Sequence, residues 1–250
     1  MERPPMSKRT EGQGWTGGGG SEQEVRKRQV LLRNAAFAAL SVEAMAEVVR
    51  KSTLVRFARR RALYEADEPG QAIFVVASGR TRVVRYGGVN RVVTLAYRGP
   101  GELLGESCVA GADTHEDSAL AQDTVEAVMI PARLVARLLD AHTGFCRRLL
   151  AVMGERRREI EVRLQALLTR SVESRLAEFL LDAATHYGIP ESRGVLVGVK
   201  FTHQEVASYI GATRETVTVT LGDLKRRELL LVDHRRLVLT DVDALRALVR

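Results

Sequence analysis

Residues 202–227 read Thr-His-Gln-Glu-Val-Ala-Ser-Tyr-Ile-Gly-Ala-Thr-Arg-Glu-Thr-Val-Thr-Val-Thr-Leu-Gly-Asp-Leu-Lys-Arg-Arg, and this stretch decides the fold of the C-terminal part. Thr202 and Glu205 match a capping box, in which each side chain satisfies a backbone N–H of the other residue, so a helix begins here. Gly211 supplies a tight turn, and Thr213 is suited to cap a second helix. Two short helices joined by a glycine turn form a helix-turn-helix.

The second helix of this motif presents polar side chains at its N-terminal end, where a recognition helix meets the edges of bases in double-stranded DNA. Arg214 is suited to a bidentate pair with guanine, and Glu215 to accept from the N4 amino group of cytosine. Thr218 lies at the same end and is a third candidate contact. Phosphate oxygens, which set the register on DNA, are expected to bind four further side chains: Thr202, Gln204, Thr213 and Thr216.

A β-hairpin is expected after the helix-turn-helix, because apolar runs at 229–232 and 237–239 flank a polar turn. Arg235 and Arg236 lie at its tip and would follow the phosphate backbone. Thr240 and Asp241 open a final short helix. We therefore predict a winged helix-turn-helix domain over residues 171–250.

Two helices are expected before the helix-turn-helix. Residues 143–169 carry a narrow apolar stripe over about 25 residues of helix, which is long for a small domain. Such a helix cannot bury its stripe alone, so a partner helix from a second copy is expected, with packing against its own β-domain as the alternative. A second helix over 172–187 should end at Gly188, with Pro190 beyond it.

In the N-terminal half, the spacing of apolar residues changes from a helical pattern to one typical of strands. Short β-rich runs at 72–76, 81–86, 91–96 and 125–130 are separated by Gly or Pro turns at 69–70, 78–79, 87–90 and 99–101, which indicates a small β-roll or barrel. Residues 30–49 read as helical, with Ser41 as an N-cap after a break. We assign residues 30–142 to the β-roll with its flanking helices, and the Gly-rich residues 1–22 to a disordered tail.

Composition excludes several classes of protein. The chain has 250 residues and is 45% hydrophobic, enough to bury a core. Two cysteines exclude a disulfide framework and a four-cysteine metal site, and no metal is expected. No apolar run approaches a membrane span of about 20 residues and no signal peptide is present, so we expect a soluble, cytoplasmic protein without a membrane partner.

The charge alone does not establish a partner. The net charge is +7, but residues 171–250 carry 11 basic and 11 acidic side chains, so DNA binding must depend on the positions of individual residues. No Walker loop, HExxH motif or nucleophile motif is present, so an enzyme is not expected. His186, His203 and His234 are scattered, and surface or phosphate-contact roles are expected of them. The alternative to a DNA-binding protein is a ligand-binding regulatory module that acts through a protein partner.

Residues 202–230 resemble the helix-turn-helix of the CRP/FNR family of bacterial transcription regulators, and Arg214-Glu215-Thr216-Val217 is the most specific string. Gly79, Gly99-Pro100-Gly101-Glu102 and Gly105-Glu106-Ser107 look like the β-roll of its effector domain. The resemblance implies an α+β fold: an N-terminal, jelly-roll-like β-roll, a long dimerisation helix over 143–169 and a C-terminal winged helix-turn-helix. It also implies a homodimer that binds an inverted-repeat DNA site, with RNA polymerase as a protein partner.

The sequence departs from the cAMP-binding members of this family. Those members hold the cyclic phosphate with an Arg that falls here at His115 or Glu116, and Asp117 adds further negative charge that would repel a phosphodiester. The Thr-Ser pair that they present to adenine falls at Ile160-Glu161. We therefore expect a regulator that does not depend on cAMP, answering an unknown small-molecule effector or none. A nucleotide-responsive member with a non-standard phosphate pocket is the alternative.

Other elements of the family's effector site remain. Glu106 is present, and Arg156 lies where the resemblance places an Arg that pairs with it. No cofactor is expected, because relatives with an iron–sulfur cluster need several N-terminal cysteines; haem stays an alternative through Cys108 or His115. Val219 replaces the family's second recognition Arg, so we expect a half-site relaxed at one base. The candidate effector pocket comprises Gly105, Glu106, Ser107, His115, Glu116, Arg156 and Ile160.

Overall fold

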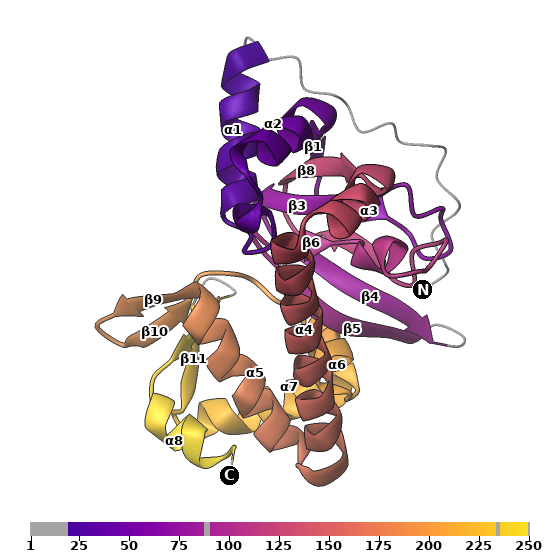
Figure 1. Cartoon of the computed structure of the whole chain (residues 1–250). Coiled ribbons are helices and arrows are strands. Elements are labelled where there is room, and N and C mark those ends of the chain that lie inside the picture. Colours follow the sequence, from indigo (N-terminus) through magenta and orange to yellow (C-terminus); the bar gives the residue numbers. More distant parts are fainter. Residues whose placement is uncertain (1–19, 88–90, 234–235, 250) are drawn as a thin grey trace. The chain divides into compact units, whose positions relative to one another are not determined.

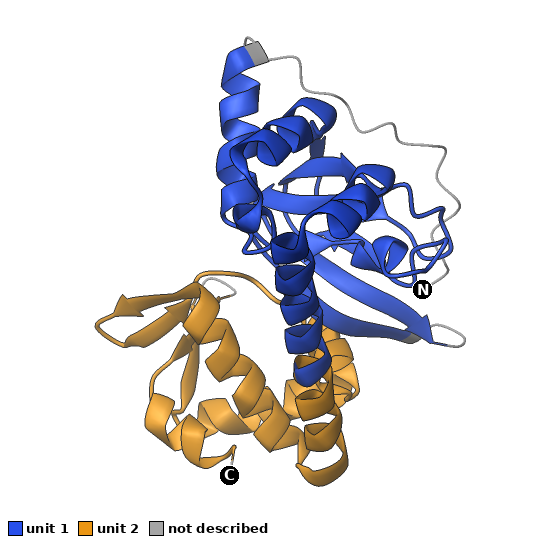
Figure 2. Cartoon of the chain, in the orientation of Figure 1, with its two compact units in different colours: residues 1–158 blue, residues 159–250 orange. Residues whose placement is uncertain are grey.

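The computed structural model of the chain describes residues 20–87, 91–233 and 236–249, and it is a mixed α+β structure (Figure 1). It divides into two compact units, residues 1–158 and residues 159–250, with the boundary inside the long helix α4 (Thr143–Thr169; Figure 2). No helix among the described residues is long and apolar enough to cross a membrane.

The first unit begins with helix α1 (Gly20–Leu32), which corrects the expectation of disorder over 1–22 for residues 20–22; residues 1–19 lie outside the described residues. The helix is held by Lys27, whose buried Nζ donates to the carbonyl oxygens of Val49 (2.5 Å) and Ser52 (2.9 Å). Leu31 is fully buried. Tertiary packing of this kind overrides the low helix propensity of a Gly-rich start.

The helical pattern expected over 30–49 is broken in the structure. It forms the end of α1, a 3-10 turn η1 (Phe37–Ala39) and helix α2 (Val42–Lys51). The side chain of Asn34 causes the break, because it accepts from the backbone N–H of Ala36 (3.1 Å) and donates to the carbonyl of Gly101 (3.0 Å), in competition with the helix. Ser41 caps α2 as expected, accepting from the N–H of Ala44 at 3.2 Å.

Two four-stranded antiparallel sheets follow, with strand orders β1-β8-β3-β6 and β2-β7-β4-β5. The turn expected over 87–90 lies mostly outside the described residues. The strands are β1 (Thr53–Phe57), β2 (Ala62–Tyr64), β3 (Ala72–Ser78), β4 (Thr81–Gly87), β5 (Arg91–Arg98), β6 (Leu103–Leu104), β7 (Ser118–Ala121) and β8 (Val125–Pro131), with a 3-10 turn η2 (Glu106–Val109) after β6.

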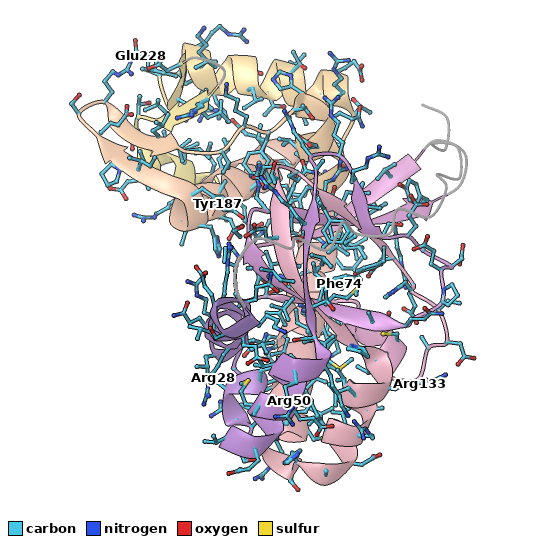
Figure 3. All side chains as sticks on the ribbon, turned by 90° about the horizontal axis from the view of Figure 1, so that it is seen from above. Arg28, Arg50, Phe74, Arg133, Tyr187 and Glu228 are labelled. Carbon is cyan, nitrogen blue, oxygen red and sulfur yellow. The ribbon has the colours of Figure 1, made fainter. Side chains whose placement is uncertain are left out.

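The sheet that contains β3 is covered on both faces. Phe74 and Val76 point into a core shared with the second sheet, whereas Ile73 and Val75 pack with the helices α1, α2 and α3 (Ala132–Ala141). This arrangement explains why β3 reads as a continuous apolar run. Figure 3 shows Phe74 among the strands, whereas Arg28, Arg50 and Arg133 lie on the surrounding helices.

The second unit contains the end of α4, helix α5 (Val172–Tyr187) and the C-terminal elements. Gly188 and Pro190, expected only as stop signals, form strand β9 (Gly188–Glu191), which pairs with β10 (Gly194–Val197). These two strands extend the predicted wing into a sheet of order β11-β12-β10-β9. The remaining elements are α6 (His203–Ile210), α7 (Arg214–Arg226), β11 (Leu230–Asp233), β12 (Arg236–Leu239) and α8 (Val242–Ala247).

Candidate nucleic-acid interface and effector site

The first helix of the motif, α6, begins at a complete capping box. The Thr202 hydroxyl accepts from the N–H of Glu205 (3.2 Å), and the Glu205 carboxylate accepts from the N–H of Thr202 (2.7 Å). The helix ends at Gly211, whose φ of +66° is left-handed. This backbone conformation favours glycine, and a Cβ at Gly211 would lie 2.4 Å from Cδ2 of Leu167 on α4, so the end of that side chain would have to move.

The second helix, α7, has a buried stripe and an exposed polar face. Thr213 caps it by accepting from the N–H of Thr216 at 3.1 Å. Its stripe of Val217, Leu221 and Leu224 is buried as the spacing predicts. The predicted DNA contacts at this end are exposed, apart from the half-buried Thr216: Thr202, Gln204, Thr213, Arg214, Glu215 and Thr218.

His203, for which a surface or phosphate-contact role is expected, belongs to this surface. Its Nδ1 lies 2.7 Å from the hydroxyl oxygen of Thr218, which joins the start of α6 to α7. The Thr218 hydroxyl also donates to the carbonyl of Arg214 at 2.9 Å. No sequence motif marks this contact, because residues 203 and 218 meet only when the two helices pack.

The wing is a two-stranded hairpin, with Asp233 opposite Arg236. Arg236 is described and half-exposed, whereas Arg235 lies outside the described residues. Arg193, from the β9–β10 hairpin, forms an ion pair of 2.5 Å with Asp233. This pair partly neutralises the acidic side chain next to the basic tip, and the sequence alone did not predict it.

In the first unit, the expected ion pair between Glu106 and Arg156 is present. Arg156 donates through Nη1 to the Glu106 carboxylate and through Nη2 to the carbonyl oxygen of Leu103. Both side chains are mostly buried, with exposed fractions of 16% for Arg156 and 20% for Glu106. Arg156 therefore ties α4 to the β6–η2 segment.

Beside this pair, His115 is buried in a stack of rings. Its imidazole lies 4.0 Å from the ring of Tyr64 at an angle of 20°, and Tyr64 stacks on Phe74 at 5.9 Å. His115 is 3% exposed, and its Nδ1 has no hydrogen-bond partner among the described residues. Gly105 closes the stack, because a Cβ there would lie 3.0 Å from Cε1 of His115.

Burial sets the protonation of these groups. It lowers the pKa of His115, which favours the neutral imidazole, although nearby Glu68 acts in the opposite direction. Burial and the neighbouring Asp117 raise the pKa of Tyr64 well above its ordinary value, and the phenol donates to Asp117 at 2.9 Å. Burial also raises the pKa of Asp117. The stack therefore offers neutral aromatic surface.

Neither candidate position for the phosphate-binding Arg carries an arginine. One candidate position for the phosphate-binding Arg holds the buried His115, and the other holds Glu116, which is exposed. Glu116 forms an ion pair of 2.6 Å with Arg85 and accepts from Arg85 Nε through its carbonyl (3.0 Å), so this cation is neutralised. The guanidinium of Arg82 donates to Thr94 at 2.9 Å.

The two remaining residues of the predicted effector pocket, Ser107 and Ile160, have no contact described with the ring stack. Ser107 follows Glu106 in η2, whereas Ile160 lies in the second unit and is 48% exposed. Burial raises the pKa of the Cys108 thiol, which donates to the carbonyl of Gly105 at 2.9 Å, and this disfavours a reactive thiolate. The described residues contain no group of His, Cys, Asp or Glu that could hold a metal ion.

Comparisons with known proteins match both units. The family model described as a cyclic nucleotide-binding domain matches residues 54–142, and the Crp-like helix-turn-helix domain matches residues 174–248. The CRP-like cAMP-activated global transcriptional regulator of Mycobacterium tuberculosis (strain H37Rv) is 25% identical over 217 residues, which cover 87% of this chain and 97% of the relative.

Two proteins of Thermus thermophilus add to this. Its cyclic AMP receptor protein is 31% identical over 174 residues, covering 66% of this chain and 76% of the relative. The solved structure of a CRP-family transcriptional regulator from the same organism has a TM-score of 0.67 and 26% identity, covering 78% of this chain and 95% of that one. The chain therefore belongs to the CRP/FNR family, and it is a DNA-binding transcription regulator.

Proposed function

We propose that the chain acts as a homodimer on an inverted-repeat DNA site, with one α7 helix in each of two successive major grooves. An apolar stripe on α4 supports this: Ile160, Leu164 and Leu167 follow one another at spacings of four and three and carry exposed side chains, as in the seam of a coiled coil. The apolar exposed members of this dimer stripe are Leu150, Ile160, Leu164 and Leu167, with exposed fractions of 62%, 48%, 54% and 38%. Residues 143–169 are thus the proposed dimerisation helix.

The recognition surface is proposed to read a guanine through Arg214 and a cytosine through Glu215. Val219, which is 64% exposed, replaces a second Arg with an apolar side chain suited to a thymine methyl group. Phosphate contacts are assigned to Thr202, Gln204, Thr213 and Thr216, and on the wing to Arg235 and Arg236. Residues 171–250 form the DNA-binding domain in this proposal.

The proposed β-roll domain, residues 30–142, does not require cAMP. The single observation that carries this proposal is the ring stack of His115 on Tyr64, closed by Gly105. The pair of Arg85 and Glu116 supports it, because this guanidinium already has a carboxylate partner in place of a cyclic phosphate. The Mycobacterium relative is cAMP-activated by its name, so this chain is proposed to have lost that response while keeping the fold.

RNA polymerase is the proposed protein partner, which places the activity in the cytoplasm. Family members are transcription regulators rather than enzymes, and the proposal assigns no catalysis to the chain. A ligand-binding module that acts only through a protein partner is disfavoured by the intact capping box and the exposed Arg214.

Fluorescence anisotropy tests the proposal. The chain is titrated onto a labelled TGTGA-type palindrome and onto a scrambled duplex, with and without cAMP, at one fixed salt concentration. We expect tighter binding to the palindrome with the same Kd in both conditions. Binding that appears only with cAMP would show that the β-roll accepts the nucleotide despite His115 and Glu116.

A further inference from the structure

The contact between His203 and Thr218 fixes the position of one proton. A threonine hydroxyl has a single proton to donate. Thr218 Oγ1 lies 2.9 Å from the carbonyl oxygen of Arg214, which has no proton and can only accept. Both contacts can be hydrogen bonds at the same time only if the Thr218 hydroxyl donates to Arg214 and Nδ1 of His203 donates to Thr218.

This assignment determines what the other ring nitrogen does. In a neutral imidazole one nitrogen carries the proton and the other is an acceptor. With the proton on Nδ1, the Nε2 atom of His203 is a hydrogen-bond acceptor. His203 and Thr218 are both exposed, so this acceptor lies on the surface that carries Arg214.

We propose that His203 is a specificity-determining residue, whose Nε2 accepts a hydrogen bond from the exocyclic amino group of a base, either N6 of adenine or N4 of cytosine. This inference rests on the proposed function, in which α7 enters the major groove. Those amino groups are the only donors that the base pairs present there. Guanine and thymine offer acceptors at the same edge, and an acceptor opposite an acceptor is repelled.

The geometry favours a base edge over a phosphate. A neutral acceptor would point its lone pair at the negative oxygens of a phosphate. The partner of His203 also lies on the recognition helix: Thr218 follows Arg214 by four residues, so both side chains share one face of α7. His203 therefore extends from α6 onto the face proposed to read bases.

The same proton count changes the role of Thr218. Its hydroxyl has no proton left to give to a base or a phosphate, so direct reading by donation is excluded while both contacts hold. Thr218 is instead a positioning residue, which holds the imidazole of His203 in one tautomer.

The experiment is a binding assay at pH 8. Anisotropy titrations measure Kd for a panel of palindromes in which each half-site position carries each of the four bases. His203→Ala should weaken binding roughly two- to tenfold on sites with the preferred adenine or cytosine, and leave the other sites unchanged. His203→Arg, which replaces an acceptor with a donor, should move the preference at that position to guanine.

Two further variants separate positioning from folding. Thr218→Val keeps the size of the side chain but removes the hydroxyl that holds His203 in one tautomer, so it should reduce discrimination at the same base position. Thr218→Ser keeps the hydroxyl and should bind with the discrimination of the unaltered chain. His186→Ala is the matched control, because His186 is an exposed histidine on α5 that bonds the carbonyl of Asp182 (2.9 Å). Thermal unfolding confirms that each variant is folded.

The outcomes are distinguishable. If His203→Ala weakens all sites equally, His203 contacts phosphate and the inference is wrong. If His203→Ala changes no Kd, the contact is structural only and the inference is again wrong. If the unaltered chain binds no palindrome better than the scrambled duplex, the proposed function itself fails, whatever the variants do.

Discussion

Among single residues, His115 shows most clearly how burial changes chemistry. Its pKa is lower in the folded chain than the ordinary value of 6.5, because burial disfavours the charged imidazolium. Unfolding below pH 6.5 therefore takes up a proton, so the stability that the neutral imidazole supports is present above that pH and is lost as the pH falls.

We expect the free energy of unfolding to decrease between pH 7 and pH 5, with a contribution from His115 of at most about 1.4 kcal/mol per pH unit. His115→Phe keeps an aromatic ring on Tyr64 but cannot titrate, so that part of the slope should disappear. Urea unfolding at pH 5, 6 and 7 measures it. Superimposable pH profiles for the two proteins would contradict the assignment.

Substitutions of Arg214 and Arg236 test which side chain reads a base and which binds the phosphate backbone. Arg214→Ala should weaken binding to the preferred palindrome by about 1–3 kcal/mol and relax the choice at one base. Arg236→Gln should weaken binding to all sequences evenly and lower the salt slope by about one. Anisotropy over a series of salt concentrations measures both. A uniform loss for Arg214→Ala would remove it from the base-reading set.

At this scale the sequence reveals local chemistry better than tertiary contacts. Arg214 and the Thr202–Glu205 capping box can be recognised in the sequence, because each belongs to a motif of residues that lie close together in the chain. The pair of Glu106 and Arg156 was expected only through the family resemblance. The contact of His203 with Thr218 and the pair of Arg85 with Glu116 join residues 15 and 31 positions apart, and no local pattern encodes them.

Among elements, helix starts were predicted well because caps are local. Ser41, Thr202, Thr213 and Asp241 each accept from a backbone N–H at the start of their helix. Strands such as β6, β7, β9 and β10 were missed, because they have only two to four residues. The strands β6 and β7 also pair with strands distant in the sequence, whereas β9 and β10 pair with each other in a short hairpin. A break before Ser41 was expected, but its cause was not, since Gly101, the partner of the Asn34 side chain, is distant in sequence.

Arg156 links helix α4 to the β6–η2 segment, so its removal should lower both the free energy of unfolding and the affinity for DNA. Arg156→Ala leaves the mostly buried Glu106 carboxylate and the Leu103 carbonyl without this donor, which should cost about 1–3 kcal/mol. Urea unfolding and anisotropy on the palindrome measure the effect. Arg148→Ala, an exposed position on the same helix, is the control. If Arg156→Ala changes neither measurement, the pair has no role.

For the whole molecule, the dimer stripe on α4 is the feature that one chain does not explain. In a homodimer, Leu164→Glu introduces two negative charges into the proposed interface, one from each copy of the chain. Loss of two buried leucines, at about 1.5–3 kcal/mol each, should weaken dimerisation more than about a hundredfold. Sedimentation equilibrium should show monomers, with weaker binding to the palindrome.

The matched control is Gln165→Glu, which adds the same charge one residue away and off the dimer stripe. It should sediment as a dimer and bind DNA normally. Equal masses for the Leu164→Glu variant and the unaltered chain would mean that α4 is not the interface.

The ring stack also determines how the β-roll would respond to metabolites. A group held by its own chain acts at an effective concentration on the order of millimolar or above, and dilution cannot remove it. Any small molecule that enters between Tyr64 and Gly105 must compete with the imidazole of His115, so its apparent affinity is its intrinsic affinity multiplied by the fraction of chains in which the ring has moved aside. Under the proposed function, such a tethered competitor would make this part of the β-roll less sensitive to changes in metabolite levels. Control of its target genes would then depend on how much of the regulator the cell makes.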